Sequence, residues 1–236
     1  MIYLSKSAYA NNASVQHPII LLEGRVSTQL TDHIQVCNDS ASSIVNWPVV
    51  SCHFKLLVRL KPGANVISLR HGYYSSSQQY TLSQRQSSYA VQPIYIISRD
   101  GDGRYQAPPG VDNSQSAAVK RISLGAALLQ TFTATNLQTH NHACATFQLP
   151  LDDSGLPVCK VFRSKYSTEE MFAMTVKELW RNIARELMES ADMPARYTSK
   201  FLGFISCSRY DGANWNSSWR HSDIVAATKG HVALGE

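Results

Sequence analysis

The sequence predicts an α+β protein in which an N-terminal β-sandwich, residues 1–90, precedes an α/β domain, residues 91–236. Three observations support this prediction. Residues 17–71 contain short apolar segments separated by turn residues, without a helical period. Residues 94–205 alternate between strand-like and helix-like segments. Residues 73–89, between these parts, are rich in Ser, Gln and Tyr and show only a weak pattern, so we place the domain boundary at their end.

The N-terminal strands are predicted from the spacing of apolar residues. Pro18–Val26 is a short apolar run with β-branched residues. Residues 47–60 alternate, and one face is mostly apolar: Val50, Cys52, Phe54, Leu56, Val58 and Leu60. This period of two predicts one half-buried strand, then a turn at Lys61–Asn65 and a return strand at Val66–Arg70. Short strands joined by turns predict an immunoglobulin-like sandwich of packed sheets.

The C-terminal half begins with a compact apolar strand, Ile94–Ile97, which ends in the turn Ser98–Gly103. A helix is expected to begin near Ser114. Its predicted buried face consists of residues that recur at intervals of three and four: Ala118, Ile122, Gly125, Leu129 and Phe132. Gly125 on this face is expected to permit close packing.

Two strands are predicted next, at Ala143–Leu149 and Pro157–Phe162, joined as a hairpin by Asp152–Gly155. A second helix is predicted next, because Ser167 with Glu170 and Thr175 with Glu178 both have the spacing of a capping box, and the second box fits the longer period. Pro194 ends this predicted helix. Its apolar positions follow the helical period: Val176, Leu179, Trp180, Ile183 and Leu187. The last predicted element is a buried strand at Phe201–Ile205.

Charge and cysteine usage limit the partners and the compartment. The net charge is +5, and no run of basic residues is present. The nearest cluster is Lys160, Arg163 and Lys165, which a solvated strand edge explains better than nucleic-acid binding. No segment approaches the ~20 apolar residues of a membrane span, and no secretory signal is recognisable. The five cysteines are widely spaced, which fits free thiols, so we expect a cytoplasmic protein without nucleic-acid or membrane partners.

Common catalytic motifs are missing from the sequence. No His is followed by Glu, so the HExxH zinc helix is absent, as are GxSxG, the P-loop and GxGxxG. Asp100 and Asp102 suggest a calcium loop, but Arg104, Tyr105 and Val111 occupy positions that an EF-hand reserves for ligands and glycine. We therefore interpret this segment as a tight turn.

Two polar segments stay open to more than one interpretation. His140, His142 and Cys144 alternate and share one face of a strand, where Cys159 could complete a zinc site. The same residues also fit a polar loop entering a strand, and a Cys–His nucleophile involving Cys144 is a further alternative. Residues 210–220, with Tyr210, Trp215 and Trp219, fit either a ligand-contacting loop or a flap whose aromatic rings pack inward.

Tyr95–Gly110, continuing through Ala117–Thr133, is the most specific of several blocks that match a known pattern. These blocks resemble a eukaryotic family of zinc metallopeptidases. His17–Arg25 and Leu60–Asn65 resemble the family's N-terminal sandwich, while Lys200–Phe204 and His231–Gly235 resemble later parts of its peptidase portion. The resemblance covers residues 17–236.

The resemblance implies that residues 91–236 are the beginning of a zincin-like domain and that complete members hydrolyse peptide bonds with zinc. In that family the HExxH helix and a further ligand follow the stretch matched by His231–Gly235. We therefore expect this chain to be a truncated, catalytically incomplete front portion, with no catalytic, cofactor-binding or metal residues of its own and no zinc bound. Protein, peptide or glycan partners are expected; the alternative is a non-enzymatic β-sandwich module that binds protein or glycan.

Overall fold

The computed structural model describes residues 1–5, 9–39, 43–83, 89–140, 142, 145–194, 198–210, 228–229 and 233–235. The fold is α+β, with strands predominating. The chain divides into two compact units, each described here by itself: unit 1 comprises Met1–Ser87 and Ala126–Leu156, and unit 2 comprises Ser88–Gly125 and Pro157–Glu236. The division into domains at residues 1–90 and 91–236 stays a prediction.

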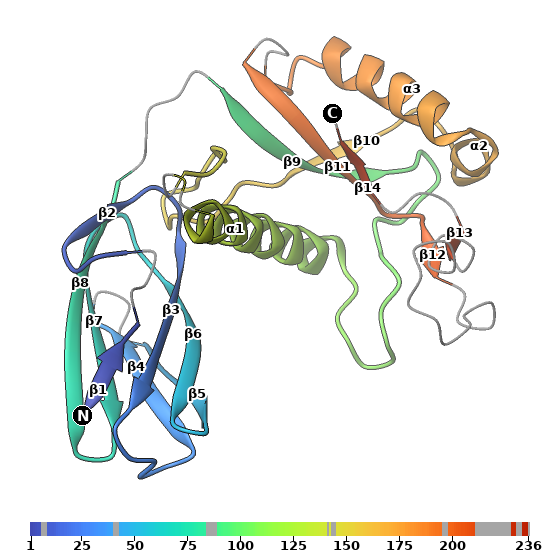
Figure 1. Ribbon diagram of the computed structural model, residues 1–236. Helices are drawn as coiled ribbons and strands as arrows, with labels where there is room; N and C mark the ends of the chain where they lie inside the picture. The colour runs from blue at the N-terminus through green and yellow to red at the C-terminus, as the bar shows by residue number, and fades with distance from the viewer. Residues whose placement is uncertain are drawn as a thin grey trace. The chain divides into compact units, whose positions relative to one another are not determined.

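Unit 1 is built on one eight-stranded sheet that curls into a sandwich-like half-barrel (Figure 1). Its strands follow the order β1-β3-β6-β5-β4-β7-β8-β2. Their bounds are β1 (Ile2–Leu4), β2 (Ala13–Val15), β3 (Ile19–Val26), β4 (His33–Asn38), β5 (Ser43–Val50), β6 (His53–Arg59), β7 (Gly63–His71) and β8 (Tyr74–Leu82). Curling lets alternate residues of all the longer strands meet in one apolar core, which includes Ile20, Leu22, Ile34, Leu56, Ile67 and Leu69.

The single strand predicted over residues 47–60 is wrong, because the chain reverses at Ser51 and Cys52. Both residues have positive φ, of 50° and 63°, as in the two-residue turns that suit hairpins. Antiparallel β5 and β6 lie on either side of this turn. The alternation is confirmed only within β6 and its following residue, where Phe54, Leu56, Val58 and Leu60 are buried. The turn lacks the Asn-Gly or Asp-Gly signal that marks such hairpins in sequence.

Two other strands of unit 1 also differ from the prediction. The predicted return strand lies within β7, but it pairs with β4 and β8 rather than returning along β6. The weakly patterned segment after Tyr73 contains β8, in which exposed residues alternate with half-buried ones as far as Gln79, and Tyr80 and Leu82 are buried. A strand with so few apolar residues gives little sequence signal.

Unit 2 contains a four-stranded sheet in the order β10-β9-β11-β14. The strands are β9 (Ala90–Ile97), β10 (Lys160–Arg163), β11 (Ser199–Ile205) and β14 (Ala233–Gly235). Central β9 pairs in parallel with β10 and β11, and β14 is antiparallel to β11. A second, two-stranded sheet pairs β12 (Arg209–Tyr210) with β13 (Thr228–Lys229). The helices are α1 (Gln115–Thr139), α2 (Thr168–Ala173) and α3 (Val176–Glu189).

The sheet of unit 2 is covered on both faces, which explains the continuous apolar run of β9. Ile94 and Ile96 pack with α2 and α3, through residues such as Leu179 and Ile183. Tyr95 and Ile97 face the other way, toward the first turns of α1. The two capping boxes are confirmed, but the single helix predicted here is two helices, α2 after Ser167 and α3 after Thr175.

The predicted hairpin over residues 143–162 is wrong for the described residues. Residues 145–150 form no strand, because the Phe147 carbonyl accepts a hydrogen bond from the Gln130 side chain at 2.8 Å instead of entering a ladder. β10 pairs with β9 and not with this segment. The Asp152–Gly155 turn does form, and the Gly155 amide donates to the Asp152 carbonyl.

The predicted apolar face of α1 is wrong in its second half. Leu129 and Phe132 are 45% and 66% exposed, and a Cβ added at Gly125 would meet no atom within 4 Å. The buried positions are small or polar: Ala118, Ser123, Ala126, Ala127, Gln130, Thr131 and Ala134. The Thr131 hydroxyl donates to the Ile19 carbonyl of β3 at 2.7 Å, so α1 lies close to the backbone of this strand. Large apolar side chains would not fit between the helix and the strand at this distance. No helix in the described part of the chain is long and apolar enough to cross a membrane.

Candidate functional site

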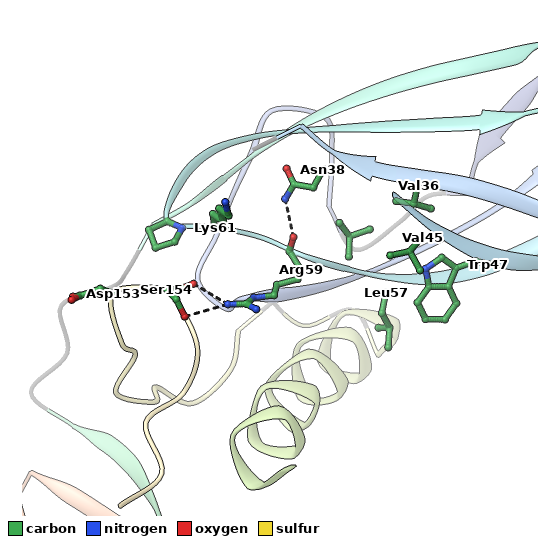
Figure 2. A pocket seen from close by; sticks show the side chains of 11 residues that line it. Val36, Asn38, Val45, Trp47, Leu57, Arg59, Lys61, Asp153 and Ser154 are labelled. Atoms are coloured by element: carbon green, nitrogen blue, oxygen red, sulfur yellow. Dashed lines mark hydrogen bonds between the residues drawn. The ribbon is translucent and has the colours of Figure 1, made fainter. Parts of the chain in front are cut away.

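Unit 1 has a groove of about 660 Å³ where β5 and β6 separate (Figure 2). The strands are paired only at Val49 with Phe54 and Val50 with His53, within ranges whose backbone the structure fully describes. The next pair in this register would join Pro48 to Lys55. Since proline has no backbone N–H, the ladder ends there and the strands diverge.

The walls of the groove are apolar along most of their length. Val45 and Trp47 come from β5, Leu57 from β6, and the buried residues Val36 and Val58 also contribute. Trp47 is half-buried and Val45 is 49% exposed, so an aromatic ring and an aliphatic side chain are open to a ligand. Apolar walls of this kind, with a few polar groups placed at one end, are typical of binding sites.

The polar end of the groove is held in place by hydrogen bonds (Figure 2). The Arg59 guanidinium donates to the carbonyl and the hydroxyl of Ser154, at 3.1 and 3.3 Å. The Arg59 carbonyl accepts from Asn38 Nδ2 at 2.8 Å. Asn38 in turn donates to Asn65 Oδ1 at 2.9 Å, and the buried Asn65 binds both the amide and the carbonyl of Lys61.

The turn that carries Ser154 is itself preorganised. Asp152 Oδ1 accepts from the backbone amides of Ser154 and Leu156, both at 2.9 Å, and from the Ser154 hydroxyl at 2.7 Å. These hydrogen bonds lower the pKa of Asp152, and the bond from the Leu156 amide has the largest effect. The Ser154 atoms that meet Arg59 therefore have a fixed position in the folded unit.

A smaller hollow of about 190 Å³ lies in unit 2, at the carboxyl ends of β9 and β11. Ser98 and Ser206 line it and are buried, while Arg104 and Asp102 are exposed. Carboxyl ends of parallel strands are where open α/β sheets bind ligands. Here, however, the surrounding polar groups already bind one another.

The turn after β9 illustrates this internal use of polar groups. Asp100 Oδ1 accepts hydrogen bonds from the Thr168 amide at 2.8 Å and from the Thr168 hydroxyl at 3.1 Å. The hydrogen bond from the amide is the main reason that the pKa of Asp100 is lowered. Arg163 donates to the carbonyls of Ser98, Arg99 and Gly101. These contacts agree with the interpretation of this segment as a tight turn rather than a calcium loop.

The predicted zinc ligands are not brought together among the described residues. His140 and His142 are exposed, and His140 Nδ1 lies 2.9 Å from the Asn136 carbonyl. Cys144 lies outside the described residues, as do Trp215 and Trp219 and the side chain of Tyr210. Across the described part of the chain, no group of three or more His, Cys, Asp or Glu side chains could hold a metal ion. The residues that the structure describes thus do not fit a zinc ion.

Three of the described cysteines, Cys37, Cys159 and Cys207, are also poor candidates for a nucleophile. Cys159 is buried against Tyr95 and Ala118, and burial raises the pKa of its thiol to about 12. Burial likewise raises the pKa of Cys207, and desolvation raises that of Cys37. A raised pKa keeps a thiol protonated at neutral pH, whereas a nucleophilic cysteine needs the thiolate.

Comparison with known proteins places the chain in a family. Residues 4–236 match the model of a family described as "Putative peptidase family". The chain belongs to this peptidase family. A curated relative described as "Putative zinc metalloproteinase", from Schizosaccharomyces pombe, is 22% identical over 251 aligned positions. The alignment covers 96% of this chain but 38% of the relative, so the chain spans well under half of that protein's length.

Among solved structures, the crystal structure of CopC from Methylosinus trichosporium OB3b matches 37% of this chain and 98% of its own, at 12% identity. Its TM-score of 0.28 is too low to support an argument about fold or function.

The groove of unit 1 was not predicted. The sequence signal that could have revealed it is Pro48, because proline within a strand is confined to edges and bulges.

Proposed function

We propose that this chain is the front portion of a zinc-dependent peptidase and does not hydrolyse peptides by itself. The observation that carries the proposal is the family match, which runs through both units, beside a zinc-metalloproteinase relative that extends far beyond the aligned region. In this proposal unit 2 is the beginning of a zincin-like domain. Its mostly parallel sheet with helices on both faces supports that assignment.

The chemistry of zinc peptidases explains the proposed lack of activity. Zinc lowers the pKa of a bound water, and a nearby carboxylate takes the proton before attack on the peptide carbonyl. Two histidines four apart on a helix, with a Glu between them, supply that arrangement in HExxH enzymes. This sequence contains no such motif, and the described residues do not fit a metal ion.

The chain's surroundings follow from the same proposal. Free thiols at the described cysteines support a cytoplasmic location. Protein or peptide partners fit a peptidase, and the lack of a basic cluster speaks against nucleic acid. A second candidate function, a non-enzymatic module that binds protein or glycan, is favoured by one observation, the preformed groove of unit 1.

A cleavage assay tests the main proposal. Purified chain is incubated with a mixture of unstructured peptides and added zinc, and the products are analysed by mass spectrometry. We expect no cleavage above that of a heat-denatured control. Turnover that is abolished by EDTA, restored by zinc and co-purifies with the chain through two chromatographic steps would contradict the proposal.

A further inference from the structure

We propose that the groove of unit 1 binds an extended, acidic peptide segment, which adds as a strand along the open edges of β5 and β6. The inference concerns unit 1 alone and is independent of any peptidase activity. The open strand edges, the apolar walls and the charge at one end of the groove each support it.

The open edge of β6 follows from its pairing with β3. The Leu60 amide donates to the Pro18 carbonyl, on the β3 side. Leu60, Val58 and Leu56 therefore direct their backbone N–H and C=O groups toward β3. Because these groups alternate in an antiparallel ladder, Lys55 and Leu57 direct theirs to the opposite side, into the groove. The β5 pairing that would occupy this side ends at Phe54.

The open edge of β5 is derived in the same way. The Val49 amide donates to the Asp32 carbonyl, on the β4 side of β5. By alternation, Ile44 and Asn46 present their amides and carbonyls to the groove, and Pro48 presents only a carbonyl. Unpaired N–H and C=O groups along a strand edge are a template for another extended chain.

The side chains of the groove suit a peptide with alternating character. Trp47, Val45 and Leu57 offer apolar surface along the strands. In a strand, alternate side chains point to opposite sides, so an added peptide would place every second side chain against this surface. The other side chains would remain in solvent.

The charge at the polar end selects the peptide. Arg59 and Lys61 are both exposed there, against one acidic residue in the lining, Asp153. Arg59 is held toward the groove by Ser154, so its position does not have to be fixed on binding. A carboxylate in the peptide would accept hydrogen bonds from these cations, which makes an acidic segment the favoured occupant.

The test uses three blocked heptapeptides and titration calorimetry with the full chain. The first alternates Glu and Val; the second alternates Lys and Val; the third is the Glu-Val peptide with alternate backbone nitrogens methylated. We expect the Glu-Val peptide to bind, and the other two to bind at least about tenfold more weakly, because one lacks charge complementarity and the other lacks strand donors.

Variants connect the binding to the groove. Lys61→Glu and Trp47→Ala should each weaken binding of the Glu-Val peptide several-fold, while Arg70→Glu, an exposed change on β7, should leave it unchanged. Circular dichroism and the melting temperature establish that each variant is folded. If Trp47→Ala fails to fold, Lys61→Glu and the methylated peptide still decide the result.

Three outcomes would overturn the proposal. One is no binding of the Glu-Val peptide to folded chain. Another is equal binding of all three peptides, which would indicate non-specific association. The third is competition by an oligosaccharide such as maltohexaose with no effect of the methylated nitrogens, which would assign the groove to glycans.

Discussion

The two units solve the same burial problem in different ways. Unit 1 curls one sheet around a single core, so strands distant in sequence, such as β1 with β3 and β2 with β8, must pair. Unit 2 covers a four-stranded sheet on both faces and has two smaller cores, one on either side of β9. The comparison shows that the curled sheet of unit 1 leaves a gap between two neighbouring strands. In the covered sheet of unit 2, by contrast, the polar groups at the strand ends hydrogen-bond to one another and hold the loops in place.

Acid should destabilise unit 1 through His17, and this is the largest effect that we expect. His17 is 2% exposed, its Nε2 lies 2.7 Å from the Tyr9 hydroxyl, and burial lowers its pKa from 6.5 to about 4. Below pH 6.5 the unfolded chain gains a proton that the folded unit does not accept until about pH 4. Stability therefore falls across that window, by up to about 3 kcal/mol in total.

Urea unfolding at several pH values measures this effect, with Trp47 as the reporter after the other tryptophans are replaced by Phe. His17→Gln should remove most of the pH dependence between 4 and 6.5, while His53→Gln, at an exposed position, should leave it intact. An unchanged slope in His17→Gln would mean that another group causes the acid sensitivity.

Unit 2 should respond instead to loss of a buried carboxylate. Glu186 on α3 accepts from the Ser164 hydroxyl at 2.6 Å and from the Lys165 amide at 3.0 Å, and so fastens the loop after β10. Glu186→Ala leaves these donors without an acceptor and should cost about 1–3 kcal/mol.

Urea unfolding followed by Trp180 fluorescence, again with the other tryptophans replaced, measures that loss. Glu189→Ala, at an exposed position of the same helix, is the matched control and should change stability by less than about 0.5 kcal/mol. Equal effects of the two changes would show that the Glu186 contacts do not stabilise unit 2.

The smallest effect concerns the helix that contributes to both units. Gly125 lies at an exposed position of α1, where an added Cβ meets nothing within 4 Å. Gly125→Ala should stabilise the chain by about 0.5–1 kcal/mol, because alanine loses less backbone entropy in a helix. Destabilisation, measured as a lower melting temperature, would instead support the close packing that the sequence pattern suggests.

Local signals predicted unit 2 better than unit 1, for physical reasons. Capping boxes act within four residues, and a strand buried on both faces has a continuous apolar run, so α2, α3 and β9 are visible in sequence. The β5–β6 hairpin depends on positive φ at Ser51 and Cys52. Turns of this kind favour Asn, Asp and Gly, so serine and cysteine give no sequence signal for the turn. Strand β8 is stabilised by its pairing with β7, which no local pattern encodes.

The candidate site was harder to predict than the fold. The groove exists because Pro48 interrupts a ladder and because Asn38, Asn65 and the Asp152 turn meet around Arg59. These contacts join residues up to 95 positions apart, so their meeting follows from tertiary structure alone. The alternating His140, His142 and Cys144 are a local pattern, and the described members of that set give no metal site.

Zinc content tests the proposed role of this chain most directly. The purified chain is saturated with zinc, dialysed against a weak chelator and analysed by inductively coupled plasma mass spectrometry alongside circular dichroism. We expect folded protein that retains far less than one zinc per chain. One tightly held zinc per folded chain would contradict the view that these residues form the front portion of a peptidase without its metal centre.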